Sequence, residues 1–173
     1  MNDEKGQLSG EYMLLVGSLI VVLMISIFMI ANENELNIAM AAAKSGADEG
    51  VASSSSAIYP KETFNEYDDR EGLKHPCSVS IVNVSYNSSG IDENYGKQKI
   101  QFKVYAKASV DYNKKELDSI GDRINYNLRK SVAMSFNTAD STNKLYNPVF
   151  SNNYVFTTAN VVWVLSLIHI SEP

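Results

Sequence analysis

Cysteine is almost missing from this chain. Among 173 residues only Cys77 carries a thiol. A single cysteine excludes an internal disulfide framework and a zinc site built from several cysteines. We expect no metal ion and no other cofactor.

The chain also lacks an excess of basic residues. Fifteen Lys and Arg stand against twenty Asp and Glu, for a net charge of −5. Binding a polyanion requires clustered basic residues. The basic residues are scattered along the sequence, as at Lys97, Lys99, Lys103, Lys107, Lys114, Lys115, Arg129 and Lys130. The composition argues against nucleic acid as a partner, and the length suits one modest domain with an appendage.

A catalytic set of residues is missing as well. His75 and Cys77 flank Pro76, but residues this close cannot easily face one another as base and nucleophile, and no third partner is indicated. The acidic stretch Tyr67–Glu71 lacks the alternating ligands and the glycine of a calcium-binding loop. Surface loops are the simpler interpretation of both. We predict that the chain is not an enzyme.

A long uncharged segment, Tyr12–Ala31, is the strongest feature that the sequence does contain. About 20 apolar residues in a helix suffice to cross a bilayer. No small-residue cleavage site of the secretory type follows it. Instead, small or apolar residues continue at helical spacing, at Leu36, Met40, Ala43, Ala47 and Val51. We predict one helix over residues 7–52, apolar and then amphipathic, which the serines of 53–56 and Pro60 bring to an end.

The residues before this segment form a motif. A short charged leader, MNDEKG, is followed by GQLSGEY, which places Gln7, Ser9, Glu11 and Tyr12 next to the junction residue Gly6. The arrangement resembles the class III signal peptide of euryarchaeal type IV pilin-like proteins, whose hallmark is a Q-x-S-x-E-Y sequence after a Lys-Gly junction. The resemblance covers about the first third of the chain.

The resemblance implies processing and assembly. A prepilin peptidase in the membrane would cut between Gly6 and Gln7 on the cytoplasmic side and remove the leader, residues 1–6. The apolar helix would stay with the mature chain. It would lie first in the cytoplasmic membrane and then in the core of an extracellular filament, made of this chain alone or mixed with other pilins.

Glu11 has a role under this interpretation. Cleavage creates an α-amine at Gln7, and the Glu11 carboxylate of one subunit would neutralise the amine of the next. The alternative is an interfacial carboxylate that extends to the lipid headgroups.

The implied function is that of a structural subunit of an adhesive surface filament. A minor or tip pilin, or a membrane-held binding module, is the main alternative. A membrane-anchored enzyme is a third, which no residue pattern favours.

The rest of the chain predicts a small α+β outer domain at residues 77–165, after a linker and loop at 53–76. In one strand, KIQFKVYAKASV, apolar and polar residues alternate. Asn113, with Glu116 three residues on, marks a helix start. The predicted elements are a strand at 78–86, a turn at 87–96, a strand at 99–110, a helix at 114–135 and a strand at 154–165.

Two further features concern modification and the C-terminus. Asn83 and Asn87 begin N-glycosylation sequons beside a predicted strand, although this composition supplies about 2.6 such matches by chance. Pilins of the family that the chain resembles are often glycosylated, so both are candidate sites. The final string SLIHISEP, residues 166–173, resembles a translated sequencing adapter; a native strand end is the alternative.

Overall fold

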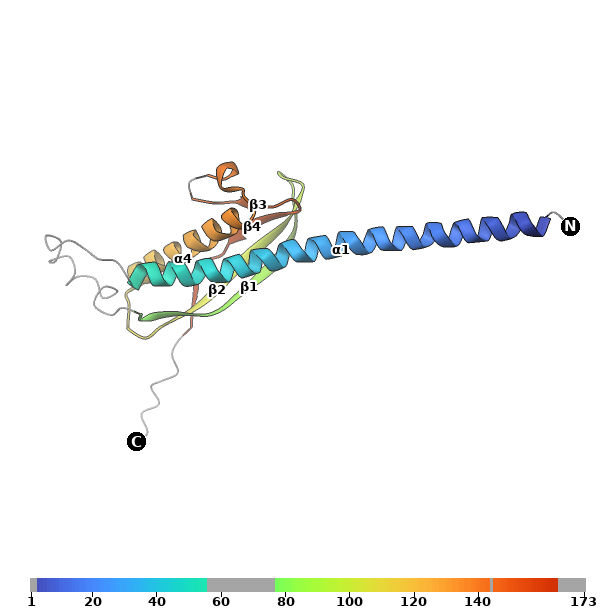
Figure 1. Ribbon diagram of the computed structural model, residues 1–173. Helices are drawn as coiled ribbons and strands as arrows, with labels where there is room; N and C mark the ends of the chain where they lie inside the picture. Colours follow the sequence, from blue (N-terminus) through green and yellow to red (C-terminus); the bar gives the residue numbers. More distant parts are fainter. Residues whose placement is uncertain (1–2, 56–76, 144, 165–173) are drawn as a thin grey trace, which may run out of the picture. The chain divides into compact units, whose positions relative to one another are not determined.

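Helix α1, Asp3–Ser55, begins the fold, and an α+β arrangement follows it (Figure 1). This computed structural model describes residues 3–55, 77–143 and 145–164. The chain divides by its internal contacts into two units, Met1–Asn37 and Ile38–Pro173. The predicted fold class, a long apolar N-terminal helix with an α+β domain, is confirmed.

The sheet is mixed, with strand β2 at its centre. The strands that the structure describes are β1 (Val79–Asp92), β2 (Lys97–Ala108), β3 (Val149–Phe150), β4 (Tyr154–Thr158) and β5 (Val162–Trp163). Strand β2 pairs antiparallel with β1 and parallel with both β4 and β5, and β3 pairs antiparallel with β4. A parallel pair needs a crossover connection. Helix α4, Lys114–Ser135, lies in the connection from β2 to β4, followed by the 3-10 turn η2, Ala139–Ser141.

Strand β2 shows the alternation that the sequence predicts. Ile100, Phe102 and Val104 are almost fully buried, whereas Lys103 between them is exposed. The Phe102 and Phe156 rings stack with their centroids 5.6 Å apart. These residues form the core between the sheet and helix α4.

Strand β1 is longer than predicted, and the expected turn at 87–96 is correspondingly wrong. The ladder continues through Asn87, which pairs with Gln101, as far as Asp92. Only residues 93–96 form the turn. An irregularity in register between Ser88 and Ile91 contains Gly90 at φ 83°, a conformation that favours glycine.

The predicted last strand exists but is interrupted. Strands β4 and β5 both lie along β2, with a break after Thr158. The Ala159 amide still donates to Phe102, while its carbonyl accepts from the buried Asn125 side-chain amide at 3.0 Å. The Asn125 side chain of α4 therefore satisfies the backbone carbonyl of Ala159, which lies where the strand is interrupted.

Helix α4 has the predicted bounds, and its capping is confirmed. The Asn113 side chain accepts from the Glu116 amide at 3.0 Å, and the Glu116 carboxylate accepts from the Asn113 amide at 3.1 Å. This is a capping box. Ile124, Leu128 and Val132, at four-residue steps, are fully buried.

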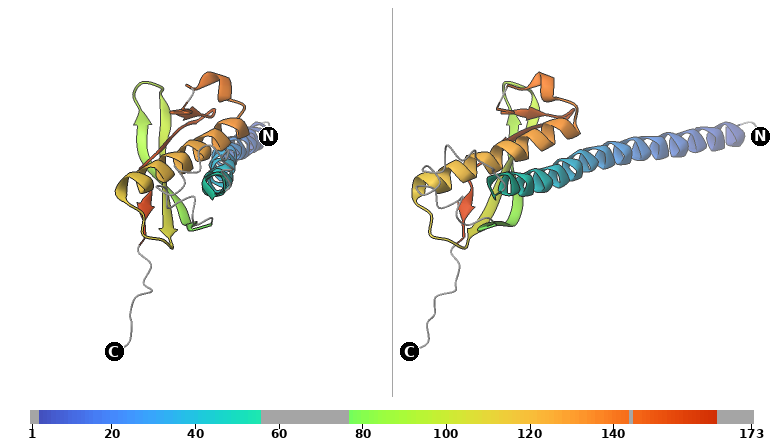
Figure 2. Two further views of the ribbon diagram at one scale, coloured as in Figure 1. Left: turned by 90° about the vertical axis from the view of Figure 1, so that its left-hand side faces the viewer. Right: turned by 60° about the vertical axis from the view of Figure 1, so that its left-hand side comes forward.

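The C-terminal part of α1, residues 38–55, packs against α4 through small residues, and the two lie side by side on one side of the sheet (Figure 2). A Cβ atom at Gly46 would lie 2.5 Å from the Asn127 carbonyl oxygen, and one at Gly50 would lie 2.7 Å from the Ile124 Cα. The backbones of the two helices therefore approach too closely for any larger residue at either glycine.

The buried face of α1 differs in part from the predicted one. Ala43 and Ala47 are fully buried as the spacing indicated. Leu36, Met40 and Val51 are only half-buried. The residues buried beside the two alanines are Ala39, Ala42, Gly46 and Gly50. The helix thus buries its smallest side chains rather than its largest apolar ones, and Gly46 and Gly50 are the positions that meet α4.

Two predicted segments lie outside the described residues. These are residues 56–76, which include most of the expected linker, and the terminal residues 166–173. Ser53–Ser55 belong to α1.

Candidate processing and assembly segment

The motif residues occupy the first turns of α1. The backbone of Gly6, Gln7 and Ser9 is helical, and their side chains are outside the described part of the chain. Glu11 and Tyr12 are exposed. Positions four apart share one face of a helix, so Gln7 and Glu11 lie one turn from each other.

The apolar segment after the motif, residues 12–31, is exposed at every residue except the half-buried Val16. Its large side chains range from 51% exposed at Ile20 to 77% at Leu14. By length and composition the helical segment Gly10–Ser53 can cross a membrane. Contiguous apolar surface on this scale marks an interaction site. The segment is therefore compatible with membrane insertion.

Cleavage between Gly6 and Gln7 would have a definite electrostatic consequence, because α1 runs through this bond. The new helix terminus would expose unpaired backbone N–H groups and an α-amine. Both are positive, and a carboxylate near a helix N-terminus is stabilised by them. Glu11 would stand one turn inside that terminus, at the edge of the apolar surface.

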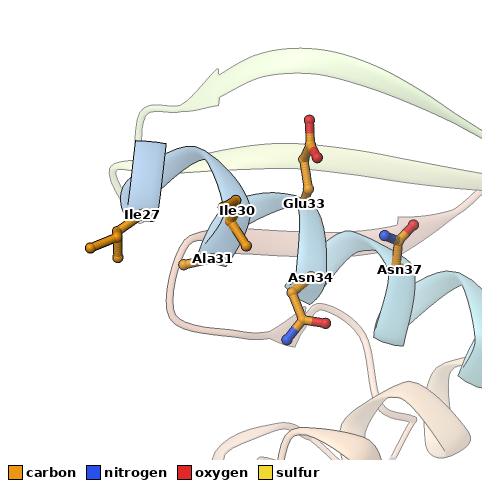
Figure 3. A pocket seen from close by; sticks show the side chains of 6 residues that line it. All are labelled: Ile27, Ile30, Ala31, Glu33, Asn34 and Asn37. Carbon is orange, nitrogen blue, oxygen red and sulfur yellow. The ribbon is translucent and has the colours of Figure 1, made fainter. Parts of the chain in front are cut away.

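The apolar segment ends in a band of amides and carboxylates. A shallow hollow there is lined by the α1 side chains labelled in Figure 3, Ile27, Ile30, Ala31, Glu33, Asn34 and Asn37. A single helix supplies all of these side chains, so they do not enclose a small molecule. We interpret Glu33, Asn34 and Asn37 as the polar boundary of the apolar surface of α1.

Of the catalytic and metal-binding candidates considered from the sequence, only Cys77 lies within the described residues. Cys77 is an exposed free thiol with φ 64°. His75 and the acidic stretch 67–71 lie outside the described residues. Within the described part of the chain, no three His, Cys, Asp or Glu residues are placed to hold a metal ion.

The two sequon asparagines lie on one face of β1. Asn83 pairs with Tyr105 and Asn87 pairs with Gln101 in the ladder, and both asparagines are exposed. Directly paired residues of an antiparallel ladder project to the same side. Tyr105 and Gln101 alternate with the buried residues of β2, so both asparagines point away from the core.

Arg129 is a polar feature that the sequence did not single out. Its guanidinium donates to the Leu145 carbonyl at 3.2 Å and to the Thr158 hydroxyl. It thereby joins α4 to the following loop and to β4. Burial lowers the pKa of Arg129, and the nearby Asp122 carboxylate acts in the opposite direction.

Comparison with known proteins adds no relative. No protein-family model, curated protein or solved structure matches the chain.

Proposed function

We propose that this chain is a structural subunit of an archaeal type IV pilus-like surface filament that serves adhesion. A prepilin peptidase removes residues 1–6 at the cytoplasmic membrane. The mature subunits then assemble outside the cell through their apolar helices.

One observation carries the proposal: an apolar, exposed helical segment is continuous with a helix that packs into a folded domain. The window of α1 that could span a membrane is 0% buried, whereas Ala39, Ala43 and Ala47 are fully buried. A removable secretory signal would have no reason to continue as part of a domain core. The segment is expected to remain attached and to be covered by lipid or by other helices.

The first experiment tests processing by mass spectrometry of the mature N-terminus. We expect the chain to begin at Gln7. Gly6→Val should leave full-length precursor in the membrane, because the junction residue must be small. Gly10→Val is the matched control, since a Cβ at Gly10 meets nothing within 4 Å. Normal cleavage of Gly6→Val, or equal failure of both variants, would contradict the proposal.

The second experiment tests the role of Glu11 in assembly. Losing one partner of a buried ion pair costs about 3–5 kcal/mol. Glu11→Ala should therefore be cleaved at Gly6 and inserted, yet yield few filaments. A cleaved Glu11→Ala chain that assembles normally would exclude the pairing, and loss of cleavage would place Glu11 in peptidase recognition instead.

N-terminal glutamine can cyclise and lose its amine, which would remove the proposed partner of Glu11. The same mass measurement detects this change as a loss of ammonia. The share of this chain in purified filaments then separates a bulk subunit from a minor or tip pilin.

A further inference from the structure

The sheet face that points away from the helices carries a column of lysines. We call it the open face and define it by the residues that the β1–β2 ladder, or for Lys99 the alternation along β2, places there: Ser80, Asn83, Ser85, Asn87 and Asp92 of β1, and Lys97, Lys99, Gln101, Lys103, Tyr105 and Lys107 of β2. Four lysines oppose one carboxylate within this set. The face is thus positive in a chain whose net charge is −5.

Two of these lysines already have partners. The Lys97 ammonium donates to the Ser151 carbonyl at 2.6 Å and lies 5.9 Å from the Phe150 ring centroid. Lys99 lies 3.9 Å from the Asp92 carboxylate. Both are held at one end of the open face.

The other two, Lys103 and Lys107, form no ion pair within the described residues. They are four residues apart on one strand, so their Cα atoms lie about 13 Å from each other. The Lys103 ammonium lies 5.4 Å from the centroid of the Tyr105 ring, and Tyr105 lies between the two lysines along the strand. The column therefore offers two cations whose attachment points on the strand have a fixed spacing.

Neutral hydrogen-bonding groups line the column. Asn83 pairs with Tyr105, Ser85 pairs with Lys103, and Asn87 pairs with Gln101. Amide and hydroxyl side chains both donate and accept hydrogen bonds. A ligand that carries spaced anions and many hydroxyls would match this combination of groups.

We propose that the open face binds an acidic polysaccharide, with its carboxylates at Lys103 and Lys107 and its hydroxyls on the amides and hydroxyls of β1. The proposal rests on display of the domain outside the cell, as in the proposed function, but not on filament formation. It names the class of surface to which such a filament would adhere.

Nucleic acid fits the open face less well. The residues of the open face include no arginine, the side chain that binds phosphate in a bidentate manner. The Tyr105 ring is covered by Lys103 and so is not free to stack on a base. Two unpaired cations would also neutralise few phosphates, whereas duplex binding draws on many.

The test uses the full chain in neutral detergent micelles, produced in a host that leaves Asn83 and Asn87 unglycosylated. Polygalacturonate oligomers are the probe, and their methyl esters are the uncharged control ligand. We expect binding of the acid form that weakens as salt rises, because exposed charges are screened. The methyl esters should bind far more weakly.

The decisive comparison is between two double variants of equal charge. Lys103→Gln with Lys107→Gln should weaken binding about tenfold, because it removes both cations that the ligand's carboxylates would contact. Lys114→Gln with Lys115→Gln removes two exposed lysines of α4 and should leave affinity within about twofold.

Three results would overturn the proposal: no binding of the acid form by the unaltered chain, equal losses in the two double variants, or tighter binding of duplex DNA than of polygalacturonate. None of these depends on cleavage or assembly. The mass of the mature N-terminus tests the proposed function separately.

Discussion

The two halves of helix α1 reverse the usual relation between hydrophobicity and burial. Around Gly17 the side chains are large and apolar, and a Cβ there would meet nothing within 4 Å. Around Gly46 they are small, and a Cβ there would strike the Asn127 carbonyl oxygen at 2.5 Å. We call residues 38–55 of α1 the small half and residues 3–37 the large half. The small half packs inside the folded domain, whereas most large apolar side chains of the large half are exposed.

The two halves of helix α1 therefore have separate roles: one packs inside the domain, and the other presents an apolar surface. Close packing of backbones needs small residues and tolerates few substitutions. An exposed apolar surface needs only to remain apolar and helical if its partner is lipid, but it becomes position-sensitive if its partner is another helix. Substitutions that act on one half alone can therefore separate the two tasks.

The largest effect is expected from removing the small half. A fragment that begins near Ser53, the predicted start of the linker, lacks the buried residues Ala39, Ala43 and Ala47. It should show no cooperative unfolding transition, because the core beside α4 would be open and a domain has only about 5–15 kcal/mol of stability in total. A fragment beginning at Ile38 should unfold cooperatively, as followed by fluorescence of Trp163, the only tryptophan. A cooperative Ser53 fragment would contradict the packing of α1.

The second effect comes from a single added methyl group. Gly46→Ala should lower the free energy of unfolding of the full chain in micelles by about 1–3 kcal/mol, the usual cost of overpacking. Gly121→Ala in α4 is the matched control, because its Cβ would lie 3.4 Å from Val161 Cβ, an ordinary contact. That variant should be neutral or gain up to about 1 kcal/mol from helix propensity. Equal urea midpoints for the two would count against the close approach.

Much of the domain could be predicted because its local signals are strong. The alternation of β2 and the capping box at Asn113 with Glu116 each have one simple structural interpretation. The interruption after Thr158 could not be foreseen, because it involves Asn125 from a distant part of the sequence. Tertiary contacts decided that boundary.

The packing face of α1 and the open face were missed for a different reason. Alanine and glycine add little to a hydrophobic pattern, so Gly46 and Gly50 did not stand out although they fix the helix contact. Lys99, Lys103 and Lys107 are scattered only when the sequence is considered without the strand that contains them. At even spacing on a strand they share one side. The processing motif, in contrast, stays a prediction from resemblance.

A smaller effect is expected at the start of α4, the helix that receives the small half of α1. Asn113→Ala removes the acceptor of the Glu116 amide and the capping box with it. The expected loss is about 1 kcal/mol in the free energy of unfolding. Asp111→Ala, at an exposed position just before the cap, should change stability by less than about 0.5 kcal/mol. Similar losses for both would contradict the assignment of the loss to the cap.

The smallest effect on the domain should come from Gly17→Ala, the counterpart of Gly46→Ala in the apolar half. A methyl group at Gly17 meets nothing within 4 Å, and alanine favours the helix by about 1 kcal/mol. Because residue 17 lies outside the unit that contains Trp163, the urea midpoint reported by that tryptophan should not move. A shifted midpoint would show that the two halves of α1 are energetically coupled. If the midpoint holds while filament yield falls, Gly17 lies where apolar helices of neighbouring subunits approach closely, and the large half is then position-sensitive in the same way as the small one.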